Sequence, residues 1–136
     1  MAAGPPVPPP SLTSEERAAF EKGVAEFNAG RFFECHDTLE DLWAGVRGPS
    51  RDFFQGLIQV AVGLYHFGNH NRVGAERLLG RALQRLEGYP AEYAGLDVAA
   101  LRSCVVEWRR ALQPQGGTDP PPHPLPRLRP ASEGSG

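Results

Sequence analysis

The sequence predicts an all-α protein, a single compact bundle of about five helices built from antiparallel helical hairpins. Apolar residues recur three and four positions apart in five segments, as they do on one face of a helix. No segment alternates apolar and polar residues with a period of two, so we expect no sheet. The length of 136 residues suits one domain, because domains cluster near ~100–150 residues.

The first two helices are expected to form a hairpin. A capping box from Thr13 to Glu16 opens the first helix, and Gly30 follows its last residues as a C-terminal glycine. The second helix is predicted over 31–44. It ends at a group of helix-breaking residues, Gly45, Gly48 and Pro49.

The third helix, capped by Ser50 and running to about Phe67, is predicted to be central. No Asp, Glu, Lys or Arg occurs in 53–69, and the helix is apolar on most sides, which is typical of a helix surrounded by protein. Gly56 and Gly63 give a neighbouring helix room to approach closely. A membrane-spanning helix needs ~20 mostly apolar residues, and this segment contains glutamines, a histidine and glycines, so we expect no membrane span.

The fourth and fifth helices complete the bundle. The fourth is predicted over 72–87, with a leucine-rich stripe and an opposite ridge of arginines that we interpret as solvated. The fifth starts at the cap Asp97 and ends near Leu112. The bundle domain is therefore predicted over 12–113.

Proline-rich ends flank this domain. Five of the six residues at 5–10 are proline, and the tail from residue 114 is rich in proline and glycine. We expect the arm 1–11 and the tail 114–136 to be disordered. The first residues contain no basic stretch followed by an apolar one, so no signal peptide is predicted.

Composition narrows the classes of function. A net charge of −2 offers no basic excess to neutralise phosphates, so a dedicated nucleic-acid-binding role is disfavoured. The two cysteines, Cys35 and Cys104, form no CxxC pattern, which favours a reducing compartment and a cytoplasmic location.

Polar residues interrupt the apolar stripes of the second and third helices. His36 and Glu40 lie one turn apart among large apolar residues, and further polar residues follow one line on the third helix. Because the link between these helices is short, we expect them to be antiparallel neighbours whose polar groups face each other. We call these residues the polar line, which comprises His36, Glu40, Gln55, Gln59 and His66.

Three interpretations of the polar line stay open. Burying polar groups without partners costs ~1–3 kcal/mol each, so the line can be a hydrogen-bonded network that fixes helix register. It can also be a site for an organic ligand or a partner. Finally, His36, Glu40 and His66 can ligate a divalent metal (Zn, Mn or Fe) or act as acid and base. The HxxxE spacing is a weak motif, and neither HExxH nor ExxH occurs.

Two further residues extend the candidate ligand site. Arg51, at the start of the third helix, can reach Glu40 or Asp41, or bind an anion at the same helix end. Trp43 is a core residue or, where it is partly exposed, a contact residue. The candidate ligand-binding residues are therefore His36, Glu40, Trp43, Arg51, Gln55, Gln59 and His66.

Two adjoining stretches resemble a known family. FNAGRFFECHDTLEDLW, followed by RDFFQGLIQVAVGLYHFGNHNRVGAERLLGRAL, closely resembles the domain of unknown function family 309 over about 20–87. Its pattern is FN-x-G-x-[FY]-[FY]-E-x-H-x-x-L-E-x-x-W and then F-x-Q-G-L-I-Q-x-A-x-x-x-x-H. Asp37 departs from it, since glutamate is commoner there. The signature falls on Phe27, Asn28, Gly30, Phe33, Glu34, His36, Leu39, Glu40, Trp43, Gln55, Gly56, Gln59 and His66.

The resemblance implies a compact helical bundle found in bacteria and plastids, and it supplies no reaction. Two hypotheses about function follow. The first is a binding module that holds a small molecule, a protein partner or another copy of itself around the polar line. The second is a hydrolase-like, metal-dependent or acid–base enzyme that uses His36, Glu40 and His66.

Overall fold

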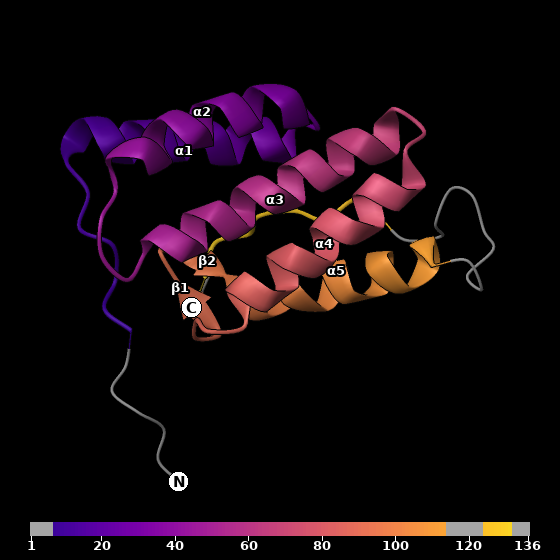
Figure 1. Ribbon diagram of the computed structural model, residues 1–136. Helices are drawn as coiled ribbons and strands as arrows, with labels where there is room; N and C mark the ends of the chain where they lie inside the picture. The colour runs from indigo at the N-terminus through magenta and orange to yellow at the C-terminus, as the bar shows by residue number, and fades with distance from the viewer. Residues whose placement is uncertain (1–6, 114–123, 132–136) are drawn as a thin grey trace, which may run out of the picture.

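The structure is a computed structural model that describes residues 7–113 and 124–131. Within these residues the predicted bundle of five helices is confirmed. The helices are α1 (Ser14–Asn28), α2 (Phe32–Gly45), α3 (Arg51–Gly68), α4 (Arg72–Leu86) and α5 (Val98–Leu112). Each helix packs against the next one along the chain. Figure 1 shows α1 and α2 on one side of α3, with α4 and α5 on the other.

A small antiparallel hairpin lies between α4 and α5, so the expectation of no sheet is wrong. It consists of β1 (Glu92–Tyr93) and β2 (Leu96–Asp97). Ala94 and Gly95 make the turn with positive φ angles of 54° and 78°. Strands of two residues are too short to show a period of two, which is why the sequence pattern did not reveal them.

The central position predicted for α3 is confirmed. Half of its residues are buried, and it packs against both α2 and α4. A Cβ added at Gly56 would lie 3.0 Å from Leu86 Cδ2, and one at Gly63 would lie 3.1 Å from Leu79 Cδ2. The two glycines therefore let α4 approach closely, as the sequence suggested.

The helix caps match the predicted ones at α1 and α5 and differ at α3. Thr13 and Glu16 form the predicted capping box, with two reciprocal hydrogen bonds of 3.0 Å. Asp97 caps α5 by accepting from the Ala100 N–H at 2.9 Å. Ser50 is buried and makes no capping hydrogen bond, so its predicted role is wrong. None of the helices in the described ranges is long and apolar enough to cross a membrane.

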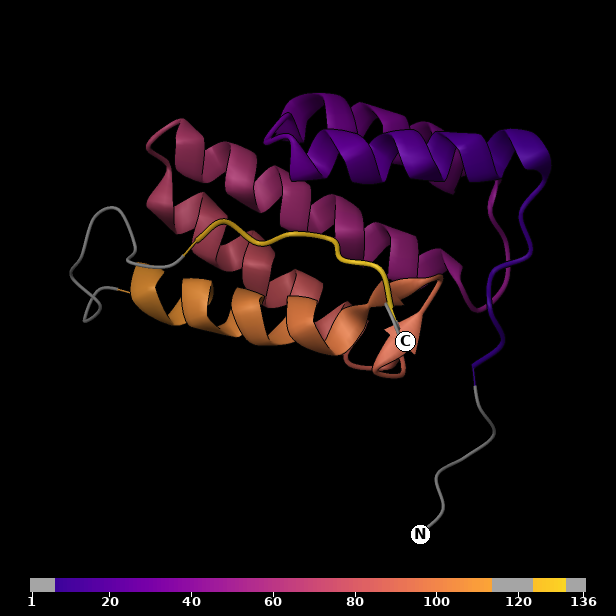
Figure 2. The same cartoon turned by 180° about the vertical axis from the view of Figure 1, so that it is seen from behind.

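Part of the tail is packed on the bundle, contrary to the predicted disorder of 114–136. Residues 124–131, which we call the strap, run in extended conformation between α1 and α5 (Figure 2). Pro126 and Leu128 of the strap are buried. The other residues of the predicted tail lie outside the described ones. A proline-rich segment has no periodicity of its own, so its sequence does not reveal that it docks.

The predicted disorder of the arm 1–11 is likewise wrong where the arm is described. Val7 packs against the core, and the Tyr93 hydroxyl donates a hydrogen bond of 2.6 Å to the Pro8 carbonyl. Residues 1–6 lie outside the described part of the chain.

Candidate functional site

α2 turns a different face inward from the one the sequence predicted. Cys35, Leu39 and Leu42 are its buried residues. The side chain of His36 is 24% exposed and that of Glu40 is 53% exposed, so neither lies in the core. The sequence places Phe32, His36, Leu39 and Trp43 on one face of this helix, and that predicted face shares Leu39 with the observed one. Its large aromatic residues favoured the face with His36, whereas the neighbouring Cys35 is the residue that the core buries.

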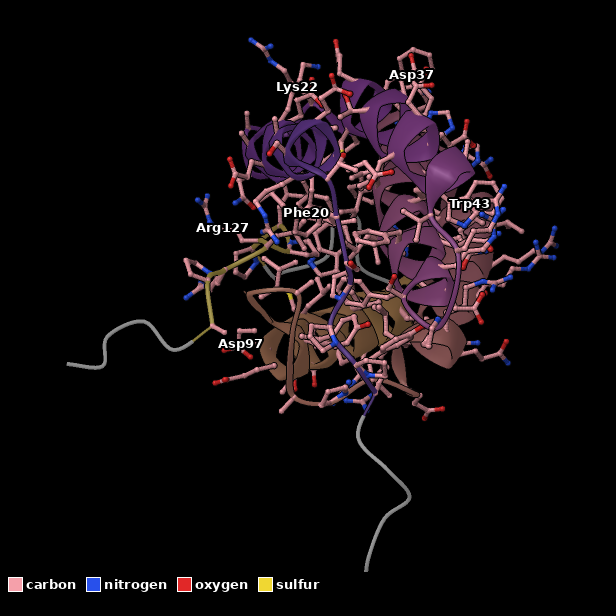
Figure 3. The ribbon with its side chains drawn as sticks, turned by 90° about the vertical axis from the view of Figure 1, so that its left-hand side faces the viewer. Phe20, Lys22, Asp37, Trp43, Asp97 and Arg127 are labelled. Atoms are coloured by element: carbon pink, nitrogen blue, oxygen red, sulfur yellow. The ribbon has the colours of Figure 1, made fainter. Side chains whose placement is uncertain are left out.

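His36 belongs to a surface cluster formed across α2 and α3. Its Nε2 lies 3.3 Å from Glu40 Oε2, and its Nδ1 lies 3.5 Å from Asp37 Oδ1. Its ring lies 5.8 Å from that of Phe33, and Phe33 packs in turn against Tyr65 at 5.4 Å. In Figure 3, Asp37 points away from the bundle, whereas Phe20 points into it.

The metal set predicted from His36, Glu40 and His66 is not assembled. His36 and Glu40 contact each other. His66 lies beside Tyr65, with 6.3 Å between the ring centroids. Across 7–113 and 124–131, no group of three or more His, Cys, Asp or Glu side chains is arranged to hold a metal ion.

Contacts of Arg51 with Trp43 and Val46 stabilise the link between α2 and α3. The Arg51 guanidinium lies 3.9 Å from the centroid of the Trp43 ring. Its Nη1 donates hydrogen bonds to the carbonyls of Trp43 at 3.0 Å and Val46 at 2.8 Å. These are carbonyls at the end of α2, where a cation is favoured. Arg51 therefore has partners within the chain in place of the anion or carboxylate that the sequence suggested.

Gln55 and Gln59 line a separate feature, an open hollow of about 780 Å³ between α3 and α4. None of the other candidate residues of the polar line lies in its wall. The α4 side contributes Arg81 and Arg85, and Tyr89 closes one end. The full lining is Val7, Pro49, Asp52, Gln55, Gln59, Arg81, Gln84, Arg85, Gly88 and Tyr89.

The hollow contains hydrogen-bonding groups that the chain itself does not use. Gln59 Oε1 is buried and has no hydrogen-bond partner among the described residues. Arg85 Nη1 is neutralised by Asp52 Oδ1 at 2.6 Å. Arg81 is exposed and makes no ion pair within the described ranges. The wall therefore presents the uncompensated cation of Arg81, whereas the unpaired Gln59 oxygen lies beneath its surface.

Tyr89 lines the hollow and has a structural role there. Its hydroxyl donates a short hydrogen bond to the Pro49 carbonyl. Burial raises the pKa of Tyr89 above its ordinary value, so the hydroxyl keeps its proton and this bond to higher pH than an exposed tyrosine would. This bond joins the region after α4 to the link that precedes α3.

The sequence identified the two glutamines of the hollow but missed its arginines. Arg81 and Arg85 belong to the ridge on α4 that was interpreted as solvated. Their spacing of four residues was the available signal. It did not show that this ridge borders α3, because that depends on how α4 is rotated against its neighbour.

These features define a small all-helical bundle domain with a polar hollow beside its central helix. Residues 20–78 match the family model described as Domain of unknown function (DUF309), which confirms the resemblance noted in the sequence. Residues 20–78 are therefore similar to a DUF309 domain. Asn28, Gln55 and Gln59 lie within the matched part, whereas Arg81, Arg85 and the strap lie beyond it.

Two bacterial relatives are similar to this chain. "Uncharacterized protein YpuF" of Bacillus subtilis (strain 168) is 40% identical over 78 residues, which cover 54% of this chain and 45% of that protein. An uncharacterised protein of Aquifex aeolicus (strain VF5) is 23% identical over 95 residues, covering 69% of this chain and 28% of that protein. The chain thus spans less than half the length of either relative. Their names report no activity.

Proposed function

We propose that this protein is a binding module that holds a small polar anion in the hollow between α3 and α4. The observation that carries the proposal is Arg81, an exposed guanidinium without an ion-pair partner among the described residues, in the wall of a ligand-sized hollow. Volumes of ~300–1,000 Å³ are usual for small-molecule sites.

The charge of the hollow favours an anion. Asp52 pairs with Arg85, so the positive charge of Arg81 stays uncompensated. A carboxylate or phosphate group can accept charge-assisted hydrogen bonds from this guanidinium. The ligand class is therefore a small hydroxylated carboxylate or phosphate ester, with its anionic group on Arg81 and its hydroxyls toward the glutamine side chains of the wall.

The alternative hypothesis, an enzyme that uses His36, Glu40 and His66, has less support. The pair of His36 and Glu40 lies at the surface, and neither residue lines the hollow. A cytoplasmic location remains part of the proposal, supported by two free thiols, Cys35 and Cys104, that are not paired with each other.

Substitution of Arg81 tests the proposal. We would titrate the ¹⁵N-labelled full chain with phosphate, citrate and 3-phosphoglycerate, following the side-chain amide signals of Gln59 by NMR. At least one probe should bind saturably. Arg81→Gln should weaken that binding about tenfold or more, because a hydrogen bond to a charged group contributes ~1.5–3 kcal/mol.

Arg77→Gln is the matched control. Arg77 is exposed, lies one turn earlier on α4 and does not line the hollow. Its removal changes the net charge equally, so affinity should stay within about twofold if local contacts dominate over long-range attraction. Equal weakening in both variants, or no saturable binding of any probe, would show that the hollow is not an anion site.

A further inference from the structure

The strap is attached to the bundle mainly through its main chain. The side-chain amide of Asn28, at the end of α1, makes two hydrogen bonds to Leu128. Its Nδ2 donates to the Leu128 carbonyl at 2.9 Å, and its Oδ1 accepts from the Leu128 N–H at 2.8 Å. The side-chain amide of Asn28 thus binds both the N–H and the carbonyl of Leu128. This contact does not depend on the side chain of the residue that is held.

The strap also extends the β-hairpin. The Asp97 N–H donates to the Arg129 carbonyl at 2.9 Å, and the Ala131 N–H donates to the Gly95 carbonyl at 2.9 Å. Leu96 and Pro130 form an antiparallel bridge. Adding an extended peptide to a free strand edge is a common way in which proteins bind short segments of other chains.

Side chains supply the specificity of this contact. Pro126 and Leu128 are buried, whereas Arg127 and Arg129 between and after them are exposed. At the other end of the strap, the Trp108 indole N–H donates to the Pro124 carbonyl at 2.8 Å. The groove thus accepts an extended segment with a Pro-x-Leu pattern.

The strap does not fill the groove. A hollow of about 470 Å³ continues beside Leu128 and Pro130, between α1 and the hairpin. Its apolar lining includes Phe20, Val24 and Leu96. A segment from another protein can therefore make contacts here that the strap leaves unmade. This gives such a segment a way to compete with the tethered strap.

We propose that the groove between α1, the β-hairpin and α5 is a peptide-binding site for extended Pro-x-Leu segments of a partner protein. The chain's own strap occupies the site and acts as a tethered competitor. Tethering through a short linker gives the strap an effective concentration in the millimolar range, so a free peptide binds well only when the strap is weakened or outcompeted. Asn28, inside the matched DUF309 region, is the residue that positions the bound main chain.

The test measures binding of a fluorescein-labelled peptide, PLPRLRPA, to full-length protein by fluorescence anisotropy. Leu128→Ala weakens the strap by removing its buried side chain. This variant should bind the peptide at least about tenfold more tightly than the wild type. Leu125→Ala is the matched control, because Leu125 is 48% exposed and its removal should leave peptide affinity unchanged.

Asn28→Asp, added to Leu128→Ala, removes the amide donor while it keeps the shape of the side chain. It should weaken peptide binding about tenfold or more, because the Leu128 carbonyl loses its donor. A folded Leu128→Ala protein that does not bind the peptide would overturn the proposal, as would equal binding with and without Asn28→Asp. Dimerisation of Leu128→Ala in sedimentation, without peptide binding, would overturn it too, because the occupant would then be a second copy.

A second measurement covers a Leu128→Ala protein that does not fold. Unlabelled peptide at millimolar concentration is added to the ¹⁵N-labelled wild type, and the Leu128 amide signal of the strap is followed by NMR. A saturable shift of that signal, and not of the Trp43 indole, is expected as the peptide replaces the strap and the Leu128 N–H leaves Asn28. No shift would overturn the proposal.

Discussion

At the scale of single residues, Cys35 carries the clearest pH dependence. It is completely buried on the inner face of α2, and burial raises the pKa of its thiol to about 12, with a smaller contribution from Glu26. The unfolded chain ionises this thiol near its ordinary pKa of 9.0. The folded chain therefore keeps a proton that the unfolded chain loses. Stability should be complete below pH 9 and fall between pH 9 and 12.

This loss can be separated from those due to Cys104, Tyr89 and Tyr93, whose pKa values burial also raises. Between pH 8 and 10 the free energy of unfolding should fall by about 1 kcal/mol because of Cys35, since one pKa unit corresponds to ~1.4 kcal/mol. Urea denaturation of the wild type and of Cys35→Ala at several pH values isolates this contribution. The variant should lose correspondingly less stability over that range. Parallel curves for the two proteins would show that the thiol is not desolvated as described.

Cys35 and His36 also show why the buried face of α2 could not be predicted from the sequence. Two stripes on α2, one with Cys35 and one with His36, both contain Leu39 and both fit helical spacing. The choice between them depends on how α2 is rotated against α1 and α3, and periodicity carries no information about that rotation. Gln55 and Gln59 were correctly recognised as unusual polar residues on a buried helix, yet their partners across the hollow were not.

At the scale of elements, the link between α2 and α3 depends on the stacking of Arg51 on Trp43. The flat guanidinium covers the indole and caps two carbonyls at the same time. Lysine keeps the charge but cannot stack as a plane or reproduce the fork. Arg51→Lys should therefore lower the free energy of unfolding by about 1–3 kcal/mol, mainly through lost hydrogen bonds to a charged donor.

Chemical denaturation followed by tryptophan fluorescence checks this prediction. Arg77→Lys is the control, because Arg77 is exposed and should change stability by less than about 0.5 kcal/mol. If Arg51→Lys is as stable as the control, the stacking contributes nothing measurable. The connection must then be held by other contacts.

Helix positions were predictable because local signals determine them. The Thr13 capping box, the Asp97 cap and Gly30 after α1 fix helix ends through hydrogen bonds between near neighbours in sequence. The β-hairpin and the strap were not predictable in the same way. The strap is held by residues up to 100 positions away, such as Asn28, and no local pattern encodes such pairing.

At the scale of the whole molecule, the strap closes the bundle on the side where α1 and α5 do not meet. The most extensive helix contacts run between sequence neighbours, and the strap fills the groove between the first and last helices (Figure 2). Pro126 and Leu128 supply apolar burial, and Asn28 and Trp108 supply hydrogen bonds. The helices themselves do not depend on the strap for their backbone hydrogen bonds.

A chain that ends after Gln113 should therefore keep its helices and lose stability. Loss of a buried leucine alone costs about 2–5 kcal/mol in protein cores. Since ~1 kcal/mol shifts the melting temperature of a domain this size by about 4–8 °C, the truncated chain should melt at least about 10 °C lower. Its far-UV circular dichroism should remain helical. Excess PLPRLRPA peptide should restore part of the lost melting temperature by mass action, because it binds only the folded groove.

A scrambled peptide of the same composition is the control, and it should not raise the melting temperature of the truncated chain. Loss of the helical signal on truncation would mean that the strap is an obligatory part of the folding unit. A truncated chain with an unchanged melting temperature would mean that the buried leucine and the Asn28 clamp contribute no net stability. Recovery by the strap peptide alone would show that one groove can be filled from within the chain or from outside it, with Asn28 as the common point of attachment.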